Sequence, residues 1–321
     1  MKLEFRLLFV LFLSFPIIGF SQQNDTLINK LDSLDKRADS SGTQFNNTSP
    51  AAYNESTKLT FKSYYTLLAS DLKQVFTKPF HMTRKDWGNL GKFAVVIGAL
   101  AFFDEPIQKG AVKLTGSHPG LKNVSKYVTK FGGRYETYTL AAFGAYGIIF
   151  KSQKIKTTTL LATQAYITGS AVEGVIKFIS GRTRPSYYDP HVEAEPTFRG
   201  PFLKPPNDGK KVYSSFPSGH TTVAFAAATV FALEYKDHLV VPIIAYSAAT
   251  LIGLSRITEN VHWATDVLAG AAVGFLIGKQ VVNNYHRYPK LKAPNQKKNT
   301  VVFNLQYYSG HIVPGIIYKF R

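Results

Sequence analysis

The chain has 321 residues, of which 45% are hydrophobic and 14% aromatic, so it is long enough to bury a sizeable core in one large domain. Its formal charge of +18 favours an anionic partner such as a lipid surface or a phosphorylated substrate, but no basic helix or stacked-aromatic pattern indicates nucleic acid. The absence of cysteine excludes disulfides, thiol catalysis and zinc–thiolate sites.

Residues 1–21 have the pattern of a secretory signal peptide. A charged start precedes an almost continuous apolar run, and small residues stand before a cleavage point after Ser21. The apolar run is short for a membrane span, which makes an uncleaved anchor the weaker interpretation. Residues 22–88 are predicted to be a polar leader followed by one helix between 59 and 76. The protein is therefore expected to be exported, to the periplasm or the cell envelope.

Six apolar segments follow, and each is predicted to be a helix of one bundle domain that spans 89–285. They cover residues 90–104, 136–150, 158–180, 219–235, 239–256 and 262–283. Small residues dominate several of them, which lets helix backbones approach closely in a tightly packed bundle. Residues 286–321 are predicted to form a basic linker and a short C-terminal β-hairpin. The predicted fold class is an all-α six-helix bundle with that hairpin appended.

The connection 181–217 is long and carries a polar motif at each end, which is typical of an active-site loop. The motif before it places Lys177 and Arg184 seven residues apart, about two helical turns. The helix must end near Arg184, because Pro185 disfavours helical geometry in the residue before it. A basic helix C-terminus favoured by the helix dipole would also explain Lys177.

The second motif, Pro217-Ser218-Gly219-His220, joins this connection to the next predicted helix. Ser218 is a good N-cap, and a helix N-terminus offers free N–H groups to a phosphate. Gly219 lets an anion approach the backbone closely, and His220 is then placed to give a proton to a leaving oxygen. Taken alone, the motif could also be an ordinary turn-to-helix junction.

The third motif contains Arg256, His262 and Asp266. His262 and Asp266 are four residues apart at the start of a helix, so they share one helix face. The carboxylate can accept the Nδ1–H of the imidazole and leave Nε2 free as a base or nucleophile. An isolated pair at this spacing could merely cap a helix, but Arg256 adds a further cation just upstream.

Lys-x6-Arg-Pro, Pro-Ser-Gly-His and Ser-Arg-x5-His-x3-Asp, in this order between helices, resemble the type 2 phosphatidic acid phosphatase and vanadium haloperoxidase superfamily. Every signature residue is matched, and the helix pattern extends the resemblance to roughly 89–285. The resemblance implies that His262 attacks phosphorus to form a phosphohistidine, that Asp266 orients it, and that His220 protonates the leaving group. It also implies a set of residues that holds the phosphate oxygens: Lys177, Arg184, Arg256, Ser218 and Gly219.

The expected function is that of a phosphoric ester hydrolase acting on phosphomonoesters or terminal phosphates. The resemblance implies no metal or other cofactor, with vanadate as an inhibitor or analogue. The apolar, aromatic-rich composition favours a phosphorylated lipid as substrate and a membrane-associated or integral protein; no obligate protein partner is evident. The alternatives are a soluble nonspecific acid phosphatase acting on small phosphate esters, a vanadate-dependent haloperoxidase, and a non-enzymatic membrane bundle or transporter.

Overall fold

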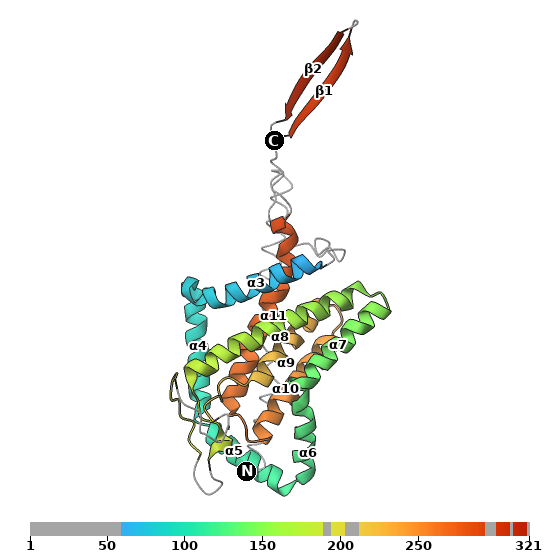
Figure 1. The fold of residues 1–321 in the computed structure, drawn as a ribbon. Helices are drawn as coiled ribbons and strands as arrows, with labels where there is room; N and C mark the ends of the chain where they lie inside the picture. The colour runs from blue at the N-terminus through green and yellow to red at the C-terminus, as the bar shows by residue number, and fades with distance from the viewer. Residues whose placement is uncertain (1–58, 189–193, 203–211, 293–299, 309–310, 320–321) are drawn as a thin grey trace.

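A computed structural model describes residues 59–188, 194–202, 212–292, 300–308 and 311–319. The predicted signal peptide and most of the leader lie outside these residues. The described chain is mostly helical (Figure 1). Its α-helices are α3 (Phe61–Thr77), α4 (Arg84–Ala101), α5 (Asp104–Ser117), α6 (Pro119–Val128), α7 (Arg134–Ile149), α8 (Gln153–Ser180), α9 (Gly219–Glu234), α10 (Val240–Thr258) and α11 (Ala264–Lys292). Three short 3-10 helices are η2 (Lys78–His81), η3 (Thr129–Gly132) and η4 (Pro185–Tyr187).

The predicted number of bundle helices is wrong. Within the described residues there are nine α-helices, and two of them, α5 and α6, fill the stretch between the first two predicted segments. Both are short and rich in Lys, Gly and Ser, so neither carries a long apolar run. Helix α11 also continues to Lys292, beyond the predicted end at 283 and into the predicted linker.

The chain ends in two strands that project beyond α11 (Figure 1). Strand β1 (Thr300–Tyr308) pairs antiparallel with β2 (His311–Lys319). The register places Thr300 opposite Lys319 and Tyr308 opposite His311. In Figure 1 the two strands lie beyond the C-terminal end of α11, away from the helix ends that carry the signature motifs.

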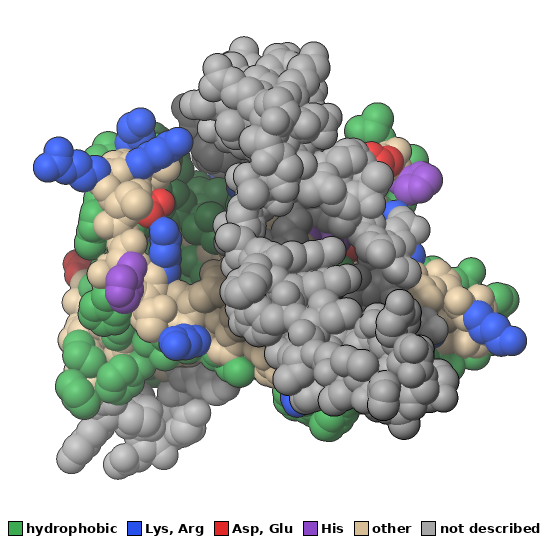
Figure 2. Space-filling model, turned by 90° about the horizontal axis from the view of Figure 1, so that it is seen from above, with side chains coloured by type: hydrophobic (Ala, Val, Ile, Leu, Met, Phe, Trp, Pro, Cys, Tyr) green, Lys and Arg blue, Asp and Glu red, His purple; other side chains and the backbone are tan. Residues whose placement is uncertain are grey.

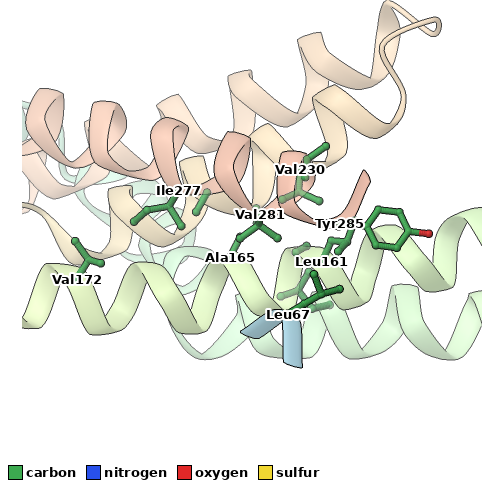
Figure 3. Close-up of a cluster of buried hydrophobic side chains, with 13 residues drawn as sticks. Leu67, Leu161, Ala165, Val172, Val230, Ile277, Val281 and Tyr285 are labelled. Atoms are coloured by element: carbon green, nitrogen blue, oxygen red, sulfur yellow. The ribbon is translucent and has the colours of Figure 1, made fainter. Parts of the chain in front are cut away.

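Helix α9 is the centre of the bundle. Most of its side chains are buried, which fits its sequence of Ala, Thr and Val on all sides. It packs between α8 and α11, with α10 on a further side (Figure 1). Figure 3 shows the resulting core, in which Val230 of α9 lies in one cluster with Leu161 and Ala165 of α8 and Val281 of α11.

A row of glycines brings α11 against the backbone of α9. A Cβ at Gly270 would lie 2.7 Å from Ser218 O, and a Cβ at Gly278 would lie 2.5 Å from Ala226 O. Gly274, between them, would place its Cβ against the carbonyl oxygen of Thr222. Because the three glycines recur every fourth residue, they form one face along which the two helices touch. This close contact aligns the N-termini of α9 and α11, where the second and third motifs lie.

The outer surface of the bundle is unusually apolar. Large hydrophobic side chains are exposed on α4, α7, α8 and α10, including Ile243 and Ile244 at more than 60% exposure. Figure 2 shows Lys and Arg side chains at the edge of one end of the molecule, beside hydrophobic ones. Two helices in the described residues are long and apolar enough to span a membrane, Val240–Thr258 and Ala264–His286, with mean hydropathies of 1.6 and 1.4. Buried core helices pass the same test, and 56% of the second window is buried.

The glycine row predicts that adding one methyl group lowers the free energy of unfolding at some glycines of the bundle and not at others. Gly274→Ala should lower the free energy of unfolding by about 1–3 kcal/mol, because the new Cβ meets a backbone carbonyl that cannot move aside. Thermal unfolding of the detergent-solubilised protein measures the change. Gly174→Ala on α8 is the control, since no atom lies within 4 Å of its Cβ, and it should be neutral or stabilising by up to about 1 kcal/mol. Equal melting temperatures for both variants would contradict the close helix contact.

Candidate active site

The first motif lies where α8 ends. Gly181 adopts a left-handed conformation with φ of 53° and donates its N–H to Lys177 O, which closes the helix. The helix ends at Ser180, as the predicted segment 158–180 does, and Arg184 follows in an extended conformation before Pro185, as the pre-proline restriction requires. Arg184 is held by Val212 and Ser214, whose carbonyl oxygens accept from its N–H and its guanidinium. Both predicted cations thereby reach one cavity.

That cavity has a volume of about 660 Å³ and brings most of the predicted residues together. Six of the eight predicted site residues line it: Lys177, Arg184, Gly219, His220, Arg256 and His262. The other lining residues include Tyr166, Ser170, Glu173 and Tyr213. Glu173 Oε2 lies 2.5 Å from Lys177 Nζ, so a carboxylate already pairs with one of the cations. The pocket is strongly basic with one acidic wall.

Ser218 and Asp266 do not line the cavity, and both are fully buried. Ser218 is the N-cap residue of α9, but its side chain makes no capping bond to the helix. Its hydroxyl instead accepts from Thr221 Oγ1 at 2.8 Å, and its N–H donates to Asp266 O at 3.0 Å. Ser218 therefore ties the N-terminus of α9 to that of α11.

Gly219 and His220 begin α9 beside the cations. A Cβ at Gly219 would lie 2.8 Å from both Glu173 Oε1 and Lys177 Nζ, so a larger residue here would displace the ends of these two side chains. His220 lies against η3 and the turn after it, where a Cβ at Gly133 would come within 3.2 Å of His220 Nε2. The Gly132-Gly133 pair thus makes the room that the imidazole occupies. Sequence analysis did not identify this pair, because no spacing rule connects it with the motifs.

Arg256 and His262 lie on either side of the tight turn that joins α10 to α11. Val261 and His262 both donate their N–H groups to Arg256 O, which fixes the two residues relative to each other. The Arg256 guanidinium is held by Glu259 Oε2 at 2.6 Å and by Thr129 Oγ1 of η3. Its remaining surface faces the cavity, so Thr129 is a further anchor that sequence analysis missed.

The geometry around His262 differs from the predicted pair. His262 Nδ1 lies 2.7 Å from Ser215 O and 3.4 Å from Asp266 Oδ2, so the shorter contact is with a backbone carbonyl. A carbonyl oxygen can only accept, so Nδ1 carries the proton and Nε2 keeps its free lone pair. Asp266 completes this arrangement from behind, because its carboxylate accepts from Ser215 Oγ at 2.5 Å and from Trp263 N at 2.9 Å.

The surroundings of both histidines favour the neutral form of the imidazole. Burial, and after it the positive charge of Arg256, lowers the pKa of His220 to about 3. Burial also lowers the pKa of His262 to about 4, although its bond to Asp266 acts in the opposite direction. The same crowding lowers the pKa of the Arg184 guanidinium to about 10, by burial and then by Arg256. A dianion in the cavity would oppose all of these shifts.

Within the part of the chain that the structure describes, no group of three or more His, Cys, Asp or Glu side chains is placed to hold a metal ion. Asp189, His191 and Glu193, in the long connection 181–217, lie outside the described residues. Apart from Glu173, the charged side chains that line the cavity are cations, which suit an oxyanion.

Comparison with known proteins places this site in a family. The sequence profile of the PAP2 superfamily matches residues 158–290. The chain is 30% identical over 192 residues to phosphatidylglycerophosphatase B of Bacillus subtilis, an alignment that covers 57% of this chain and 84% of that protein. The chain belongs to the PAP2 superfamily. The predicted membership of the phosphatidic acid phosphatase family is thereby confirmed.

Two lipid A 1-phosphatases are also similar to this PAP2 protein. That of Porphyromonas gingivalis is 52% identical over 67 residues, which are 21% of this chain and 15% of the relative. That of Rhizobium johnstonii is 29% identical over 191 residues, which are 56% of this chain and 72% of the relative. The first alignment therefore spans less than a sixth of the relative's length.

The two depressed histidine pKa values predict proton uptake when an anion binds. A group whose pKa rises on binding takes up a proton at any pH between its free and bound values. Inorganic phosphate bound at pH 6 to 7 should therefore draw up to about one proton more into the wild type than into His220→Asn. Calorimetry in two buffers of different ionisation enthalpy gives this number. An identical proton count for both proteins would show that His220 does not titrate with the bound anion.

Proposed function

We propose that this protein is a phosphatase that removes the phosphate of a phosphorylated lipid through a phosphohistidine intermediate on His262. The observation that carries the proposal is the free Nε2 of His262, in one cavity with Lys177, Arg184 and Arg256. Phosphoryl transfer needs a nucleophile and positive charge around the phosphate oxygens, and this cavity offers both. The lipid phosphatases among its relatives support the same activity.

The reaction has two displacements at phosphorus. In the first, His262 Nε2 forms an N–P bond as the P–O bond to the lipid breaks, and His220 gives its proton to the departing oxygen. In the second, water attacks phosphorus, the now neutral His220 takes the proton of that water, and the N–P bond breaks to release inorganic phosphate. Nδ1–H of His262 stays in place throughout, and Asp266 offsets the positive charge that the ring carries while phosphorylated.

His220 must be protonated in the first step, although burial and the nearby cations lower its pKa to about 3. A phosphate dianion beside His220 would raise this pKa again, because its negative charge stabilises the imidazolium and offsets the charges of Arg256 and Lys177. Binding and acid catalysis are thus coupled. The steps need no metal ion, and the three cations take the place that a metal holds in other phosphatases.

An apolar cavity beside the site favours a lipid substrate. It has a volume of about 670 Å³ and is lined by Phe131, Tyr135, Tyr138, Thr139, Ala142, Phe143, Tyr146 and Ile155. Phe131 lines this cavity, while the next two residues, Gly132 and Gly133, line the cavity that contains His262, so neighbouring residues of the chain border both. A lipid phosphate bound at His262 would find room for its hydrocarbon chains on α7.

The surface favours work at a membrane. Exposed apolar side chains on α7 and α10 and the Lys and Arg side chains at one end of the molecule suit a bilayer and its anionic headgroups (Figure 2). The signal-like segment 1–21 supports export. We therefore propose a location in the cell envelope, associated with the membrane.

Replacement of the nucleophile tests the mechanism. His262→Ala should lower kcat at least about 10³-fold and should leave no phosphate bound to the protein after an acid-free quench of the radiolabelled substrate. Asp266→Asn should keep a slow, labelled enzyme with a badly held imidazole. A metal chelator should leave the wild-type rate unchanged, and vanadate should inhibit it. Covalent label on the His262→Ala variant would exclude His262 as the nucleophile.

Replacement of one aromatic residue tests the lipid assignment. Tyr138→Asp should raise KM for a long-chain lipid phosphate about 10-fold, because about 60 Å² of lost apolar contact costs about 1.5 kcal/mol. The KM for a small soluble phosphate ester should stay unchanged. Tyr65→Asp on α3 is the matched control, since Tyr65 is also half exposed but lies on a helix that does not line the cavity. Equal KM changes for lipid and soluble esters, or higher wild-type activity on soluble esters, would favour an acid phosphatase.

A further inference from the structure

A second buried carboxylate lies behind the His262–Asp266 pair. Asp104 is the first residue of α5, is fully buried, and lies outside the segment 158–290 that the family profile matches. Its Oδ1 accepts from Thr265 N at 2.9 Å, and its Oδ2 accepts from Thr265 Oγ1 at 2.5 Å. Thr265 is the residue before Asp266, so α5 holds the first turn of α11 by two hydrogen bonds.

Arg182 joins the two carboxylates. Its NH2 donates to Asp104 Oδ2 at 2.6 Å, and its NH1 donates to Asp266 Oδ1 at 2.5 Å. NH1 also lies 2.8 Å from Thr265 Oγ1, and the guanidinium is only 1% exposed. Phe198 and Trp263 cover it, with ring centroids 4.8 Å and 5.7 Å from Cζ. The planar fork of an arginine suits such a double contact, because two separate nitrogens each reach one carboxylate, whereas a lysine has a single nitrogen to place between them.

The contact of Arg182 with both carboxylates determines which partners each oxygen of Asp266 can bind. Arg182 occupies Oδ1, which leaves Oδ2 for Ser215 Oγ, Trp263 N and His262 Nδ1. If Arg182 were absent, the carboxylate could turn about its terminal torsion, which is a soft one. Rotation would break the contacts that hold the Ser215 loop and the imidazole. Neither Asp104 nor Arg182 lines the phosphate cavity, so neither can touch a bound phosphate.

We propose that Asp104 and Arg182 are positioning residues for the nucleophile, acting on His262 through Asp266. This inference rests on the proposed phosphatase function. It makes α5, a helix from outside the matched segment, a required part of the active site. A merely structural ion pair would stabilise the fold without affecting the chemical step, and the two roles differ in what they do to kcat and KM.

Kinetics of three variants separate these roles. Asp104→Asn and Arg182→Lys should each lower kcat about 10- to 100-fold, while KM and the vanadate inhibition constant stay within about twofold. The double variant should lose less than the product of the two single losses, because both act through one bridge. Asp71→Asn is the matched control, since Asp71 is also fully buried but bonds Asn284 and Gln280 far along α11. It should leave kcat unchanged at any temperature where the protein is folded.

Loss of a buried charge can prevent folding, so a milder variant is included. Thr265→Val removes only the hydroxyl shared by Asp104 and Arg182 and should lower kcat about 3- to 10-fold with KM unchanged. Variants that match Asp71→Asn in kcat, or that raise KM and the vanadate constant instead, would overturn the positioning role.

A readout independent of turnover separates this inference from the proposed function. In protein labelled with ¹⁵N-histidine, the Nδ1–H signal of His262, assigned by its absence in His262→Asn, should shift in Asp104→Asn and Arg182→Lys but not in Asp71→Asn. An inactive wild type would reject the phosphatase function. The shift of the His262 Nδ1–H signal would even then show whether Asp104 and Arg182 position the imidazole. An unmoved signal in both site variants would reject the positioning role even in an active enzyme.

Discussion

The burial of the Asp266 carboxylate is the constraint on which the polar end of the bundle depends. A carboxylate with no access to water is costly unless every oxygen is paired. Here the partners come from three separate stretches of chain: Arg182 after α8, Ser215 before α9, and Trp263 at the start of α11. Satisfying one charge therefore draws the ends of three helices together. The same requirement brings in α5, whose Asp104 balances the charge of Arg182.

Charge crowding in the cavity complements this burial. Arg184, Arg256 and Lys177 face one space, and burial with mutual repulsion lowers the pKa of Arg184 and His220. A cavity of this kind favours an anion, because a negative charge relieves the repulsion between these cations. Helix α9 packs against both α8 and α10, which carry Lys177 and Arg256, and so holds these two cations beside one cavity. The proposed phosphate binding and the proposed protonation of His220 would thus both follow from this one arrangement.

The helices were predictable where the chain is apolar and unpredictable where it is not. The segments that became α7, α8, α9 and α10 have boundaries within a few residues of those predicted, because long apolar runs mark them. Helices α5 and α6 lack such runs and are stabilised by contacts with α10 and α11, such as Thr258 with Ser125 and Gln108 with Asn260. Those contacts join residues more than 130 positions apart in the chain, and no local pattern encodes them.

The sequence by itself determined the family, and motif order and spacing predicted eight site residues, of which six line one cavity. Spacing works for these residues because a helix end or a tight turn places each of them by local geometry alone. Only the tertiary structure decided which other residues contact and hold these motif residues. Ser215 offers His262 a backbone carbonyl, which any residue type carries, and Asp104 and Thr129 reach the motifs from distant helices. Such contacts depend on how helices pack, because burial creates the need for a partner and packing selects which residue meets it.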